Sequence, residues 1–199
     1  MSDTMLVQTK NGIRWIHTRL LAVSEDLREE QFLWRPGPMA PPIGWHLWHI
    51  ARWADRFQTM FPPADGVQRR QLWEVEGLAQ QWDLDPSTLG PLQSGEGMDH
   101  EAAARLPRQI GRDNIVDYAR RTFDLVDRDL ELVTEADVDW VRPNIAAWKV
   151  DEDGRVVAAP AAETPLATDL YYHYRHAARH LGMIEGLRGV QGLHGTASI

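Results

Sequence analysis

The sequence contains no cysteine, which excludes thiolate nucleophiles, disulfide bonds and cysteine-ligated zinc or iron–sulfur sites. Any metal in this chain must therefore be held by histidine and carboxylate side chains. The sequence also lacks a run of about 18 apolar residues, and its start lacks the features of a secretory signal. We therefore expect no membrane span and a cytoplasmic location.

The chain also lacks a cluster of lysine and arginine. Its 29 Asp and Glu residues against 21 Lys and Arg residues give a formal net charge of −8. Because the basic patch of a nucleic-acid-binding protein is missing, we expect no DNA or RNA partner. A Gly-rich phosphate loop, a G-x-S-x-G motif and an H-E-x-x-H motif are also absent, which argues against nucleotide hydrolysis, serine hydrolysis and the zincin protease mechanism.

The residues that are present have the balance of a globular protein, with 43% hydrophobic and 25% charged. No Pro/Gly/Ser-rich tract or charge run divides the 199 residues, so we expect one domain over residues 1–199. Helical spacing of apolar residues predicts four long helices. They cover residues 7–31, 43–60 and 112–134, and a last helix with Thr164 as N-cap and Pro165 at its first position, ending at Leu187.

Shorter elements are expected between these helices. Residues 68–82 are predicted to form a short helix, residues 83–97 show no clear period, and a further short helix is capped at Asp99 and stopped by Pro107. Within residues 140–162, two β-prone runs flank an Asp-Gly pair, the strongest local hairpin signal. The sequence thus predicts an all-α four-helix bundle with long crossovers and a small β-hairpin before the last helix.

Five of the eight histidines fall into two groups, His46 and His49 on the second long helix and His173, His176 and His180 on the last. Residues three, four and seven apart share a helix face, and His176 with His180 forms the i, i+4 pair used by many helical metal sites. A surface pair or satisfied core imidazoles would explain such a pair equally well. The second group favours a metal, because uncoordinated imidazoles clustered in an apolar bundle would be poorly satisfied.

Four other side chains lie close to these histidines in the sequence. Trp45 and Trp53 are interpreted either as the lining of a cavity or as core aromatics. Arg52 either meets an anionic substrate or pairs with an acidic residue such as Asp55. Tyr172 either donates a proton or orients a ligand, or it packs in the core or in an interface.

The segment GWHLWHI at residues 44–50, followed by RWAD at residues 52–55, resembles the second-helix motif of the DinB-like (DinB/YfiT) superfamily. The segment HAARHLG at residues 176–182 resembles the HxxxH motif of that family, which is followed closely by Gly. By this resemblance, His49, His176 and His180 occupy the positions of three metal ligands that usually hold zinc, nickel or iron. His46 and His173 are then additional histidines.

The resemblance also implies a homodimer formed through helices and, as in several relatives, a low-molecular-weight thiol as cosubstrate. One hypothesis is a metal-dependent enzyme of thiol-transferase or hydrolase type, whose ion keeps a position open for water or thiol and acts on a small molecule. The other is a noncatalytic metal-binding or stress-associated bundle, in which His46 or His173 closes the coordination sphere. An open site in a cavity favours the first hypothesis, and a saturated site favours the second.

Overall fold

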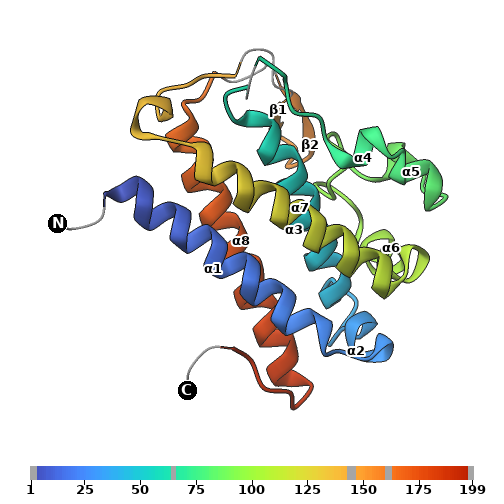
Figure 1. The fold of residues 1–199 in the computed structure, drawn as a ribbon. Helices are drawn as coiled ribbons and strands as arrows, with labels where there is room; N and C mark the ends of the chain where they lie inside the picture. The colour runs from blue at the N-terminus through green and yellow to red at the C-terminus, as the bar shows by residue number, and fades with distance from the viewer. Residues whose placement is uncertain (1–3, 64–65, 143–146, 160–162, 197–199) are drawn as a thin grey trace.

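A computed structural model describes residues 4–63, 66–142, 147–159 and 163–196. The fold is mostly helical (Figure 1). Its four long helices are α1 (Met5–Glu25), α3 (Ile43–Phe57), α7 (Arg112–Leu132) and α8 (Leu166–Val190). Helices α1 and α3 each pack against both α7 and α8, so the four helices enclose one core. The predicted four-helix bundle is confirmed.

Apolar side chains at helical spacing explain why these helices pack together. Helix α1 buries Ile13, Ile16 and Leu20, which recur three and four residues apart on one face. Helix α3 buries Trp48, whose side chain has no exposed surface. Removing a large apolar side chain from water contributes about 1.5–3 kcal/mol, so these faces hold the bundle together.

The sequence predicted the first helix over residues 7–31, and the predicted C-terminal end of this helix is wrong. The chain leaves α1 at Asp26, and a separate short helix, α2 (Glu29–Leu33), follows. The Asp26 carboxylate accepts hydrogen bonds of 2.7 and 2.9 Å from the guanidinium of Arg188 on α8. This contact with another helix outweighs the local periodicity that predicts a continuous helix.

The crossover from α3 to α7 contains five short helical elements. They are η1 (Gln58–Met60), α4 (Leu72–Val75), α5 (Leu78–Gln81), η2 (Pro86–Thr88) and α6 (His100–Ile110). The single helix predicted over residues 68–82 is therefore two helices. Gly77 separates them, because it adopts a φ of 61° in the left-handed region.

Helix α6 begins as predicted but does not stop at Pro107. Its N-cap Asp99 accepts hydrogen bonds from two backbone N–H groups, at 3.0 and 2.9 Å. The helix continues through Pro107 to Ile110, and Leu106, Pro107 and Ile110 are all buried. Burial of this apolar turn offsets the backbone hydrogen bond that proline removes.

The crossover from α7 to α8 contains η3 (Glu135–Asp137) and a hairpin of β1 (Ala147–Val150) and β2 (Val156–Ala159). The two strands pair antiparallel with Val150 opposite Val156, which confirms the predicted hairpin. Helix α8 begins one residue later than predicted, with Pro165 as its N-cap, and extends three residues beyond Leu187. Such differences at helix ends are ordinary, because the last turn of a helix frays.

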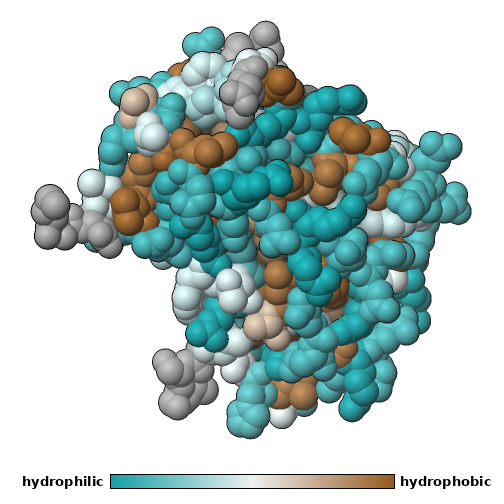
Figure 2. Space-filling model, viewed as in Figure 1, coloured by the Kyte–Doolittle hydropathy of each residue, from teal (hydrophilic) through white to brown (hydrophobic). Residues whose placement is uncertain are grey.

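The surface seen over α1 and α7 is mostly hydrophilic, with hydrophobic side chains in separate small patches (Figure 2). Within the described ranges, no helix has both the length and the apolar character needed to cross a bilayer.

Candidate metal centre

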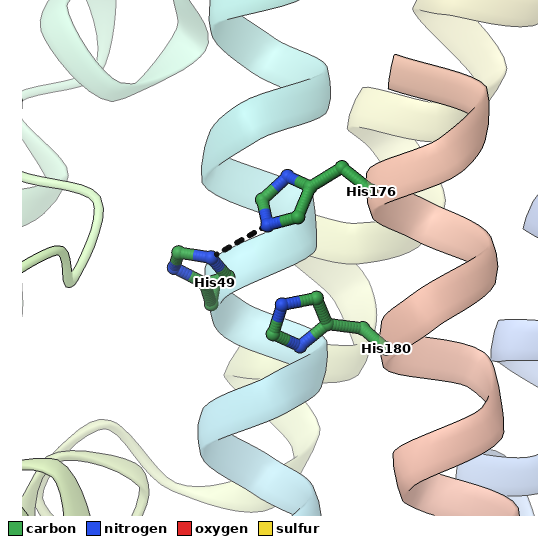
Figure 3. A group of neighbouring side chains, drawn as sticks. All are labelled: His49, His176 and His180. Atoms are coloured by element: carbon green, nitrogen blue, oxygen red, sulfur yellow. Dashed lines mark hydrogen bonds between the residues drawn. The ribbon is translucent and has the colours of Figure 1, made fainter. Parts of the chain in front are cut away.

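Three histidines from two helices meet between α3 and α8. His49 of α3 and His176 and His180 of α8 each bring one ring nitrogen within 4.8 Å of the other two, and Figure 3 shows the three rings turned towards one space. The Nε2 atoms of His49 and His176 are 3.2 Å apart. Two nitrogens bound to one tetrahedral zinc ion are separated by roughly 3.4 Å, so this donor set fits a metal ion.

Burial keeps these imidazoles neutral. Loss of hydration lowers the pKa of His49 to about 4 and the pKa of His176 to about 3. The pKa of His180 is also lowered, first by burial and then by its histidine neighbours. A neutral imidazole is the form that binds a metal, so the cluster is ready to act as a ligand set at neutral pH.

The outer nitrogens of two rings have partners that orient them. Nδ1 of His49 donates a hydrogen bond to the carbonyl oxygen of Ser94, which leaves a lone pair on the Nε2 that faces the cluster. Nδ1 of His180 lies 2.9 Å from Nδ1 of His46. When His180 is the donor in this pair, its Nε2 also presents a lone pair to the cluster. His46 is buried behind His180, and burial lowers its pKa to about 3.

His173 does not join this cluster. Its Nε2 lies 3.0 Å from Nε2 of His17 on α1, and Nδ1 of His17 lies 2.7 Å from the Asp127 carboxylate. The ring of His173 stacks on Phe57, with 4.4 Å between the ring centroids. The sequence analysis did not single out His17, whose only signal is its place in the buried stripe one turn after Ile13.

The two predicted tryptophans line the histidine cluster. Trp45 stacks on His49 with ring centroids 4.7 Å apart, and Trp53 meets His176 edge-on at 5.4 Å. Both indoles are partly buried. They form apolar walls that limit the access of water to the imidazoles.

Arg52 and Tyr172 do not face the cluster. The Arg52 guanidinium is buried and lies over the Trp73 ring. It donates hydrogen bonds to the Tyr118 hydroxyl at 3.0 Å and to the Asp55 carboxylate at 3.3 Å. Pairing with Asp55 is therefore the arrangement found. The Tyr172 side chain is 51% exposed and packs beside Arg175 on the outer side of α8.

The segment Ser94–Gly95–Glu96 also belongs to the site. The Ser94 carbonyl orients His49, as described, and Glu96 Oε1 lies 3.9 Å from His49 Nε2. The Trp53 indole donates to Glu96 Oε1, and the Ser94 hydroxyl donates to Oε2 at 2.5 Å. The predicted irregular segment over residues 83–97 therefore forms a wall of the cluster. Its sequence signal is faint, namely two glycines that flank Glu96.

Gly95 is required where the chain passes over His49. Its φ is 102°, and a Cβ atom there would lie 3.0 Å from both Trp45 and Trp48 and 3.2 Å from His49 Nδ1. We expect Gly95→Ala to lower the free energy of unfolding by about 1–3 kcal/mol, through backbone strain and overpacking. Urea denaturation measures this change. Gly37→Ala is the control, because its Cβ meets nothing within 4 Å, and equal effects of the two substitutions would contradict the prediction.

A cavity of about 870 Å³ lies between this segment and the hairpin turn. Its lining includes Gln93, Glu96, Gly97, Arg155 and Val156. The volume falls within the range of roughly 300–1,000 Å³ that is usual for small-molecule sites. Glu96 lines this cavity and also lies 3.9 Å from Nε2 of His49, so it connects the cavity wall with the surroundings of the histidine cluster.

Comparison with known proteins gives a family and a fold. The family model described as the DinB superfamily matches residues 13–184. A crystal structure of a conserved protein from Enterococcus faecalis is similar, with a TM-score of 0.66 and 17% sequence identity over 96% of this chain and 99% of that chain. At this identity the likeness supports the fold alone. No curated protein matches the chain.

Proposed function

The chain belongs to the DinB superfamily, and on this premise we propose that it is a metal-dependent enzyme of hydrolase or thiol-transferase type. The observation that carries the proposal is the group of three neutral imidazoles whose ring nitrogens lie within 4.8 Å of one another. His49, His176 and His180 would hold the ion, which the family resemblance suggests is zinc, nickel or iron. When bound, such an ion acts as a Lewis acid and lowers the pKa of a water or thiol ligand.

The protein side chains have separate tasks in this proposal. Ser94 and His46 orient His49 and His180, and outer partners of this kind fix the ring and its tautomer. Trp45 and Trp53 exclude water from two sides of the cluster. The adjoining cavity admits the small-molecule substrate, with a low-molecular-weight thiol as the proposed cosubstrate for transfer chemistry.

The noncatalytic alternative needs a fourth ligand from His46 or His173. His46 faces the outer nitrogen of His180, and His173 is paired with His17. His46 and His173 are therefore paired outside the space that the rings of His49, His176 and His180 face. This arrangement favours an open site, and hence the enzyme, over a bundle whose ion is fully enclosed.

Elemental analysis tests the proposal most directly. Protein purified without added metal and without a histidine tag should contain about one zinc, nickel or iron ion per chain. The same preparation, stripped with a chelator and reloaded, should hydrolyse esters or amides, or transfer a small thiol to an electrophile, only when the ion is present. Protein that contains no metal and takes none up on reconstitution would remove the basis for the proposal.

We also infer a homodimer and a cytoplasmic location as parts of this proposal. Exposed aromatic side chains on the neighbouring helices α1 and α8 support a dimer contact. Trp15 is 53% exposed, Tyr171 58% and Tyr172 51%. Aromatic residues of this kind are enriched in protein interfaces.

A further inference from the structure

Glu96 lies between the histidine cluster and the cavity. Its Oε1 atom is 3.9 Å from Nε2 of His49, and the side chain is 9% exposed. The same residue lines the cavity between residues 86–97 and the hairpin turn. Glu96 is therefore shared by the cavity lining and the immediate surroundings of His49.

The Glu96 carboxylate is held in place but not saturated by its partners. The Trp53 indole and the Ser94 hydroxyl each donate one hydrogen bond, one to each oxygen. Both donors are neutral and leave the negative charge of the carboxylate in place, and the Arg56 guanidinium attracts this charge through space. An ionised carboxylate has about four acceptor positions, so roughly two remain for a further donor.

We propose that Glu96 selects the group that occupies the open side of the cluster, admitting a neutral O–H or N–H donor in preference to an anion. This inference rests on the proposed function. A carboxylate this close to the ligand nitrogens repels a second negative charge in a partly desolvated site, and it accepts a hydrogen bond from a protic group. Of the two reaction classes proposed, hydrolysis is therefore favoured over thiol transfer, because water is a strong O–H donor to the carboxylate and a thiol is a weak S–H donor.

Ligand binding to the cobalt(II)-loaded protein tests the selection without an activity assay. Visible absorption titrations with azide, an anion, and with imidazole, a neutral N–H donor, are compared between the unmodified protein and Glu96→Gln. The substitution preserves the shape of the side chain and removes its charge. We expect azide to bind about tenfold more tightly to Glu96→Gln and imidazole about tenfold more weakly.

Two control variants separate charge from other effects. Glu101→Gln removes a carboxylate that is 58% exposed and pairs with Arg35 on the surface, so both titrations should be unchanged. Glu25→Gln removes another surface carboxylate, which is 41% exposed and pairs with Arg120, so both titrations should again be unchanged. Circular dichroism confirms that each variant is folded.

Three results would overturn the inference. The first is that the azide and imidazole affinities of Glu96→Gln both stay at the values of the unmodified protein or change in the same direction. The second is that the variant loses cobalt affinity and changes its spectrum before any probe is added, which would make Glu96 a ligand itself. If the unmodified protein binds no cobalt, the proposed function fails together with the inference, and this outcome is distinct from the other two.

Discussion

The His176→Ala variant should bind zinc, nickel or cobalt at least a hundredfold more weakly than the unmodified protein. Four-ligand zinc sites bind with roughly 10–16 kcal/mol, so one ligand is worth on the order of 3 kcal/mol, or more than a hundredfold. His176 is the most suitable of the three ligands to remove, because it is only partly buried. Its loss removes the imidazole whose Nε2 lies 3.2 Å from Nε2 of His49.

Isothermal titration calorimetry on chelator-treated protein measures this loss. A second readout is thermal unfolding, because an ion that binds only the folded state at a thousand times its Kd adds about 4 kcal/mol of stability. Metal should raise the Tm of the unmodified protein and raise that of His176→Ala by at most about a third as much, because a hundredfold weaker site gains about 1.4 kcal/mol at the same metal concentration. His100→Ala, which removes an exposed histidine on α6, is the matched control. Equal affinities of the two variants would show that the cluster is not the metal site.

The helices of this bundle follow from sequence because their apolar faces repeat with the helical period. Ile13, Ile16 and Leu20 mark the buried face of α1 in advance, and the same spacing outlines α7. The i, i+4 relation likewise places His176 and His180 on one face of any helix that contains them. The sequence also groups His46 and His49 on α3, but the choice of His49 as the ligand came from the family resemblance, since periodicity does not state which helices meet.

Contacts between elements explain the predictions that failed. The break at Asp26 depends on Arg188, which is 162 residues away in the chain. His173 shares a helix face with His180. It lies seven residues before His180, however, which is about 10 Å along the axis of α8. At this position on the axis, its ring contacts His17 of α1. A residue pattern along one helix therefore identifies which side chains share a face, but not which neighbouring helix each turn of that face contacts.

The wall formed by Ser94, Gly95 and Glu96 was also beyond prediction from sequence. Its segment has no hydrophobic period, and its shape depends on contacts with Trp45, Trp48 and His49. Gly95 and Gly97 both have positive φ values, of 102° and 76°. These glycines indicate an unusual backbone path, but not that the path passes over a histidine.

Chelator-treated protein should lose much of its stability as the pH falls from about 6.5 to about 5. Burial lowers the pKa of His46 and of His176 to about 3 and that of His49 to about 4, and it lowers the pKa values of His173 and His180 as well. In the unfolded chain each histidine has a pKa near 6.5. Above that pH neither state binds the proton, so these groups have no effect. Below it the unfolded state takes up protons that the folded state refuses, so stability falls until the pH reaches the folded pKa.

The change in the free energy of unfolding per pH unit is proportional to the number of histidines whose pKa is lowered in the folded protein. Each contributes up to about 1.4 kcal/mol per pH unit, so the five together lower the free energy of unfolding by about 7 kcal/mol for each unit below pH 6. Urea denaturation at several pH values in the presence of a chelator gives this slope. His46→Gln should reduce it by about 1.4 kcal/mol per pH unit, whereas His100→Gln, at an exposed position, should not change it. A free energy of unfolding that stays constant between pH 6.5 and 5 would mean that the imidazoles accept protons in the folded protein. The cluster would then be open to solvent rather than enclosed by Trp45, Trp53 and Ser94.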